Sequence, residues 1–87
     1  MGVPKSVDVR DAIIKQIRLE EYGPGYALCE IVFSLGDTGQ VGHFVMPANG
    51  VEFQAHLLAI TGAKAWPDVL GRRVKVRREN GVIEEMA

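Results

Sequence analysis

The sequence predicts an α+β domain with five strands and one helix, the strands forming a single antiparallel sheet. Apolar and polar residues alternate in several short segments, which is typical of half-buried strands. One segment, near residues 50–61, instead has apolar residues at the spacing of a helix. Short turns rich in glycine separate the first strands, which favours antiparallel neighbours.

The first strand is expected over residues 12–22. Ile13, Ile17 and Leu19 share one parity of this segment, and mostly polar residues share the other. Lys15 breaks the pattern on the apolar side. Apolar residues at a spacing of four also run through this region, so a helix is the alternative interpretation.

The clearest strand runs from Tyr26 to Leu35, after a Gly-Pro-Gly turn at residues 23–25. Its core face is expected to hold Ala27, Cys29, Ile31, Phe33 and Leu35. The opposite parity also carries apolar residues, among them Leu28 and Val32. That second face therefore needs a cover, which either a second copy of the chain or the helix can supply.

A turn at residues 36–39 leads to a third strand over Val41 to Met46. The helix is then expected from Gly50, because Asn49 and Glu52 have the spacing of a reciprocal cap. Its inner face holds Phe53, Leu57 and Ile60, and Gly62 follows it as a stop signal.

Asn80-Gly81 lies between two short apolar segments and predicts a final hairpin within residues 74–86. A two-residue loop pairs Arg78 with Ile83, which mixes a charged and an apolar face. A four-residue loop, residues 78–81, pairs Val76 with Ile83 and Lys75 with Glu84 instead, and we expect this register.

The resulting order is β-β-β-α-β-β. It matches a partly open barrel of the oligonucleotide-binding (OB) type, in which the helix lies between the third and fourth strands. A plain curved sheet with one covering helix fits this order equally well.

Composition indicates a single domain over residues 12–87, with residues 1–11 as a flexible lead-in. Ten Lys and Arg against eleven Asp and Glu give a net charge of -1, so no general attraction to polyanions or membranes follows. The one cysteine, Cys29, excludes an internal disulfide and a multi-cysteine zinc site, and it favours a reducing cytoplasm. No apolar segment approaches the roughly 20 residues that a membrane span requires.

Three segments carry a resemblance to a known group of proteins. They are residues 57–63 (Leu-Leu-Ala-Ile-Thr-Gly-Ala), residues 66–76 (Trp-Pro-Asp-Val-Leu-Gly-Arg-Arg-Val-Lys-Val) and residues 81–83 (Gly-Val-Ile). The chain here resembles small proteins of unknown function encoded by phages and prophages. In those proteins a helix precedes a Trp-x-Asp-x-Leu-Gly-basic-basic-Val-x-Val segment. The resemblance implies origin in a mobile element and a compact β-rich fold, and it assigns no catalytic residue.

A candidate binding surface combines cations with aromatic rings. Five cations lie within residues 72–78, and alternation puts three of them on one face, where they can follow a phosphate backbone. The cations are Arg72, Arg73, Lys75, Arg77 and Arg78, and the aromatic residues are Tyr22, Tyr26 and Trp66. The alternative is a solvated sheet edge whose cations pair with Glu84 and Glu85, two tyrosines that close a turn, and a tryptophan that covers the core.

No catalytic, metal-binding or cofactor-binding motif stands out in the sequence. Asp37-Thr38-Gly39 matches the triplet of retroviral-type aspartic proteases, but the residues around it indicate a hairpin turn. Neither His43 nor His56 has further ligands at zinc-binding spacing, and Cys29 is expected in the core.

We therefore expect no enzymatic activity, no cofactor and no metal. The first functional hypothesis is a cytoplasmic protein-interaction module, and homo-oligomer formation is an additional expectation. The second hypothesis is a weak binder of single-stranded nucleic acid, which predicts affinity that falls steeply with salt.

Overall fold

The computed structural model describes residues 6–48 and 50–87, and it confirms the predicted five-stranded antiparallel sheet with one α-helix. The elements are β1 (Val7–Glu21), β2 (Tyr26–Ser34), β3 (Gly39–Pro47), α1 (Val51–Thr61), η1 (Trp66–Val69), β4 (Arg73–Glu79) and β5 (Val82–Met86). The short 3-10 helix η1 was not predicted. Residues 1–5 of the expected lead-in and Asn49 of the expected cap lie outside the described residues.

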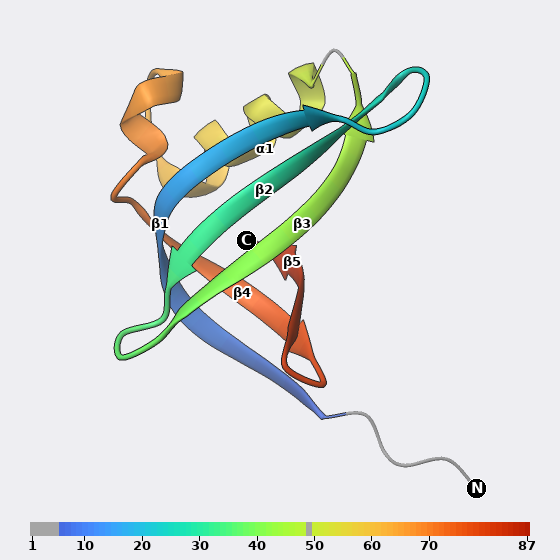
Figure 1. Cartoon of the computed structure of the whole chain (residues 1–87). Helices are drawn as coiled ribbons and strands as arrows, with labels where there is room; N and C mark the ends of the chain where they lie inside the picture. Colours follow the sequence, from blue (N-terminus) through green and yellow to red (C-terminus); the bar gives the residue numbers. More distant parts are fainter. Residues whose placement is uncertain (1–5, 49) are drawn as a thin grey trace, which may run out of the picture.

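The strand order is β3-β2-β1-β4-β5, so the first strand lies in the middle of the sheet. β1 pairs with β4 through its first half and with β2 through its second half, and the sheet curls around this long strand (Figure 1). α1 lies behind β1 and β2 in this view. Because β3 and β5 each pair with only one strand among the described residues, the fold is an open sheet with the element order of an OB-like barrel.

β1 begins at Val7, so the prediction that residues 1–11 form a lead-in outside the domain was wrong from Val7 onward. Residues 7–13 pair with β4 along its whole length. The segment looked like a lead-in because Asp8 and Asp11 interrupt its apolar residues. In the fold these carboxylates lie opposite Arg78 and Lys75 of β4, which makes polar residues suitable there.

The strand rather than the helix forms over residues 12–21, as favoured, but one face was assigned wrongly. Ala12 and Ile14 are buried before Lys15, whereas Ile17 packs against the core after it. The register shifts between Ile14 and Gln16, so Lys15 is the extra residue of a β-bulge. A bulge changes the parity of the core face, and Ile13 therefore lies on the opposite side from Ile17.

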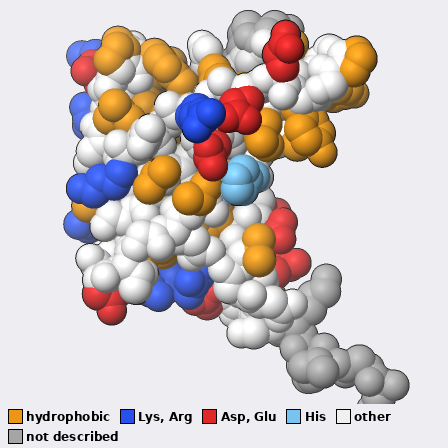
Figure 2. Space-filling model, viewed as in Figure 1, with side chains coloured by type: hydrophobic (Ala, Val, Ile, Leu, Met, Phe, Trp, Pro, Cys, Tyr) orange, Lys and Arg blue, Asp and Glu red, His pale blue; other side chains and the backbone are white. Residues whose placement is uncertain are grey.

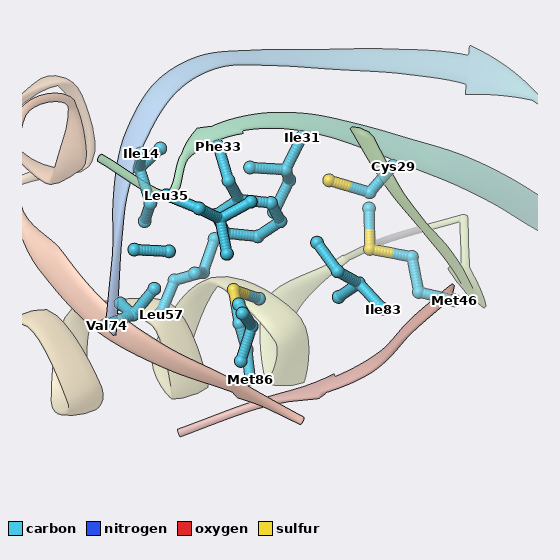
Figure 3. Close-up of a cluster of buried hydrophobic side chains, with 12 residues drawn as sticks. Ile14, Cys29, Ile31, Phe33, Leu35, Met46, Leu57, Val74, Ile83 and Met86 are labelled. Atoms are coloured by element: carbon cyan, nitrogen blue, oxygen red, sulfur yellow. The ribbon is translucent and has the colours of Figure 1, made fainter. Parts of the chain in front are cut away.

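The core lies between the curled sheet and α1 (Figure 3). Of the predicted core face of β2, Cys29, Ile31, Phe33 and Leu35 are buried, and Ala27 packs at the edge of the core. Burial raises the pKa of the Cys29 thiol to about 11, so it stays protonated at neutral pH and acts as a small apolar core residue.

α1 also forms within its predicted bounds. Leu57 is fully buried, and Phe53 and Ile60 pack against the core. The helix ends at Thr61 because Gly62 adopts a left-handed φ of 72° and donates its N–H to the Leu58 carbonyl.

The predicted register of the last hairpin was wrong. The loop contains only Asn80 and Gly81, both with positive φ, so that Arg78 lies opposite Ile83. A register shift then brings Val76 opposite Met86, not Ile83. The bulge keeps Val76, Ile83 and Met86 all buried, so apolar residues share one face although the loop has two residues and not four.

Candidate functional site

The basic segment of β4 is largely neutralised by carboxylates from neighbouring strands. Arg77 donates to Glu79 and to Glu85, each at 2.9 Å. Arg78 forms a two-pronged contact with Asp8, with Nε 3.0 Å from Oδ1, and it also donates to Gln40 at 3.2 Å. Only 19% of the Arg78 side chain is exposed, so its guanidinium holds β4 to β1 and offers little surface to a ligand.

The other three cations of the segment differ in whether a side chain or carbonyl already binds them. Lys75 lies 3.2 Å from Asp11 of β1, not opposite Glu84 as predicted. Arg72 donates from Nε to the Asp68 carbonyl at 3.2 Å. Arg73 is exposed, and no ion pair within residues 6–48 and 50–87 involves it. As predicted, Arg73, Lys75 and Arg77 share one face of β4, but two of the three already have acidic partners.

The two tyrosines of the candidate surface do not lie beside these cations. Tyr22 and Tyr26 flank the turn of the β1–β2 hairpin, where the Tyr22 N–H donates to the Tyr26 carbonyl. Arg73 lies opposite Ile13, nine residues before Tyr22, or about 30 Å along the strand. Trp66 packs against the core from η1, as the packing interpretation expected. The eight predicted residues therefore do not form one surface.

The Asp8–Arg78 contact makes stability depend on pH. Hydrogen bonds from Arg78 hold the pKa of the Asp8 carboxyl below its ordinary value of 3.8. Arg77 lowers the pKa of Glu85 in the same way. A carboxyl with a depressed folded-state pKa stabilises the fold above its unfolded-state pKa, and this contribution disappears as pH falls through the folded-state pKa.

We expect Asp8→Asn to lower the free energy of unfolding at pH 7 but to have no effect on it at a pH below the folded-state pKa of Asp8. The reason is that wild-type Asp8 is itself neutral there. Urea unfolding of both proteins between pH 2 and 7, followed by Trp66 fluorescence, measures the difference. In an Arg78→Met background, Asp8→Asn should add no pH-dependent change, and a persisting change would assign the effect to another contact.

A different surface, the outer face of β2 and β3, carries exposed apolar side chains (Figure 2). Val41 is 40% exposed, Val45 55% and Tyr26 54%, while Leu28 and Val32 are half-buried. Leu28 lies opposite Val45, and Val32 lies opposite Val41. We call these five residues the outer patch: Tyr26, Leu28, Val32, Val41 and Val45. The apolar second parity of β2 was the sequence signal for it, although it was not named as a site.

A row of charged and polar residues divides the outer patch. Arg18, Glu30 and His43 lie side by side across β1, β2 and β3. Arg18 pairs with Glu20 at 2.6 Å, and His43 lies 3.4 Å from Glu30. Hydrophobic side chains flank charged ones and a histidine on the face shown in Figure 2. Because Arg18 pairs with Glu20 and His43 lies beside Glu30, this row offers little to attract phosphate.

His56 and Asp37, the other residues considered as candidates, have contacts that belong to the fold. His56 contacts the Met86 carbonyl at 3.1 Å. No cluster of three or more possible ligand side chains occurs in the described part of the chain. Asp37 lies in the turn between β2 and β3, where Leu35 donates to the Thr38 carbonyl, as the hairpin interpretation predicted.

Comparison with known proteins adds no relative. No protein-family model, curated protein or solved structure matches the chain. Among the helices of the described residues, none has the length and apolar character needed to cross a membrane.

Proposed function

We propose that this chain is a non-enzymatic protein-binding module of phage or prophage type, which docks a partner protein on the outer patch in the reducing cytoplasm. The observation that carries the proposal is the exposure of Tyr26, Val41 and Val45 on one sheet face. The resemblance of residues 57–76 supports the origin.

The composition of the outer patch favours a protein partner. Isolated exposed apolar residues are common on proteins, but apolar side chains gathered on one face are typical of interaction sites. Tyrosine is enriched in such interfaces, since one ring provides contact area with little loss of conformational freedom. The charged row beside the patch is internally paired, so it supplies polar specificity without strong attraction to polyanions.

The test replaces Leu28 and Val32 together by lysine, whose flexible stem is tolerated on an outer sheet face. A photo-crosslinking residue at position 41, with position 73 as the matched control, first identifies the partner in the producing cells. We then expect the double variant to bind the purified partner at least about tenfold more weakly, because central interface residues carry most of the binding energy. Equal binding by the variant and wild type, or crosslinks only from position 73, contradicts the proposal. A second copy of the chain as the crosslinked partner identifies a homo-oligomer.

The second candidate function is binding of single-stranded nucleic acid, which the OB-like strand order and the shared face of Arg73, Lys75 and Arg77 favour. It ranks lower because Lys75 and Arg77 already have carboxylate partners. A phosphate must compete with those carboxylates for the same cations.

We expect labelled oligonucleotides to bind weakly at low salt and not at all at moderate salt. Each phosphate that a cation neutralises makes affinity fall more steeply with salt, and because Lys75 and Arg77 already have acidic partners, binding starts weak. Fluorescence anisotropy of the wild type and of a variant with Arg73, Lys75 and Arg77 all changed to alanine measures this. Tight binding at moderate salt that the triple variant loses would reverse the ranking of the two functions.

A further inference from the structure

The free edge of β3 exposes backbone groups that the sheet does not use. At one end of the β2–β3 ladder Leu35 donates to the Thr38 carbonyl at 2.8 Å, and at the other Ala48 donates to the Gly25 carbonyl at 3.0 Å. The register between them has no shift. Hydrogen-bonded and non-hydrogen-bonded pairs alternate in an antiparallel ladder. The β3 residues whose backbone groups hydrogen-bond to β2 are therefore Gln40, Gly42, Phe44 and Met46. The N–H and C=O groups of Val41, His43 and Val45 therefore point away from β2.

The other edge of the sheet, β5, lies across an opening from β3. No β3–β5 pairing occurs between the described residues. Gln40 closes one end of the opening, where it contacts the Gly81 carbonyl and accepts from Arg78. Beyond this closure is a hollow of about 330 Å³, lined by Phe44, Phe53, His56, Glu84, Glu85 and Met86.

The hollow has an apolar wall and an acidic rim. The rings of Phe44 and Phe53 lie 5.9 Å apart at a tilt of 40°, and Met86 is buried beside them. Glu85 is occupied by Arg77, but Glu84 is exposed and forms no ion pair with any residue in the described ranges. A side chain with an apolar stem and a cationic end, as in lysine or arginine, fits both features.

We propose that the partner supplies an extended segment, alternating apolar and basic residues, that adds to the free edge of β3. This inference rests on the proposed function and defines how the partner binds. Strand addition uses the outward backbone groups of Val41, His43 and Val45, and successive side chains then point to opposite faces. One set extends the outer patch beside Val45, and the other enters the hollow beside Phe44, where a basic residue meets Glu84.

The first experiment uses the full chain and a capped peptide, Val-Arg-Val-Thr-Val, with Val-Glu-Val-Thr-Val as the matched control. We expect the arginine peptide to slow amide hydrogen exchange at Val41, His43 and Val45 by at least about tenfold. Gly42 and Phe44 should change little, because their N–H groups already bond to β2. The glutamate peptide should bind at least about fivefold more weakly, since it places like charges together.

Two variants separate strand addition from other modes of binding. Val45→Pro removes an outward N–H without touching the β2–β3 bonds, a position where a strand edge tolerates proline. Val45→Ala shortens the same side chain and keeps the N–H. We expect Val45→Pro to weaken peptide binding at least about tenfold more than Val45→Ala does, because only proline removes the N–H, and we expect Glu84→Lys to make the glutamate peptide the better ligand. The melting temperature of each variant confirms that it folds.

The outcomes distinguish this inference from the proposed function. Equal peptide binding by Val45→Pro and Val45→Ala, or no change in exchange along β3, overturns strand addition. If lysines at Leu28 and Val32 weaken partner binding while Val45→Pro and Glu84→Lys do not, the outer patch binds the partner and strand addition is wrong. If none of these changes affects the partner, both proposals fail.

Discussion

Phe33→Ala is expected to lower the free energy of unfolding by about 3–5 kcal/mol. Phe33 has no exposed surface, and it is among the largest side chains that the core buries completely. Removing its ring loses the transfer free energy of the buried atoms and leaves a cavity between the sheet and α1 that the neighbours fill only partly. A domain of this kind has a total stability of about 5–15 kcal/mol, so the loss places the variant near the limit of folding.

Urea unfolding followed by the fluorescence of Trp66, the one tryptophan, measures this loss. Val45→Ala is the control, because Val45 lies on the outer face and is 55% exposed. The control should change stability by less than about 1 kcal/mol. A similar small change for Phe33→Ala would mean that the side of β2 assigned to the core is wrong.

The fold was predictable where local sequence and tertiary structure agree. β2 alternates without interruption, and its core residues Cys29, Ile31 and Phe33, followed by Leu35 just after the strand, are those that alternation predicts. α1 was equally predictable from the sequence, because the spacing of its apolar residues defines its core face and Gly62 defines its end. In both elements a single periodicity governs the whole segment, so counting along the chain is enough.

The two errors of register have one cause. Alternation assumes that every residue advances the strand by one step, and a β-bulge breaks that assumption. Lys15 in β1 is an extra residue, and a second shift occurs opposite Arg77 and Arg78 in the last hairpin. The sequence does carry a trace of each: Lys15 stood out as an exception, and Asn80-Gly81 indicated the short loop that the structure has.

The candidate surface was less predictable because it depends on residues far apart in the chain. The cations of β4 are close in sequence, but Asp8 and Asp11, which pair with Arg78 and Lys75, are more than 60 residues away. A pattern within one segment cannot show which charges another strand neutralises. The outer patch was indicated only by the two apolar parities of β2, since the exposed residues of β3 complete it.

Gly42→Ala is expected to destabilise the fold by about 1–3 kcal/mol, although alanine has the better general propensity for a strand interior. Gly42 lies on the inner face of β3, opposite Ile31. A Cβ added there lies only 3.0 Å from Cε2 of Phe33 and 3.0 Å from Cε2 of Phe44. Phe44 is half-buried and can move toward the hollow, but Phe33 is enclosed and has no space into which to retreat.

Gly39→Ala is the matched control on the same strand, because its added Cβ meets only the Phe33 carbonyl oxygen at an ordinary 3.6 Å. We expect it to be neutral or slightly stabilising, since alanine reduces the freedom of the unfolded chain. The double variant Phe33→Leu with Gly42→Ala should recover part of the loss of Gly42→Ala, as the smaller side chain makes room for the methyl group. Calorimetry of the three variants measures their stabilities. Equal stabilities for Gly42→Ala and Gly39→Ala would contradict the prediction, because they would mean that the rings of Phe33 and Phe44 do not lie against the backbone of β3 at Gly42.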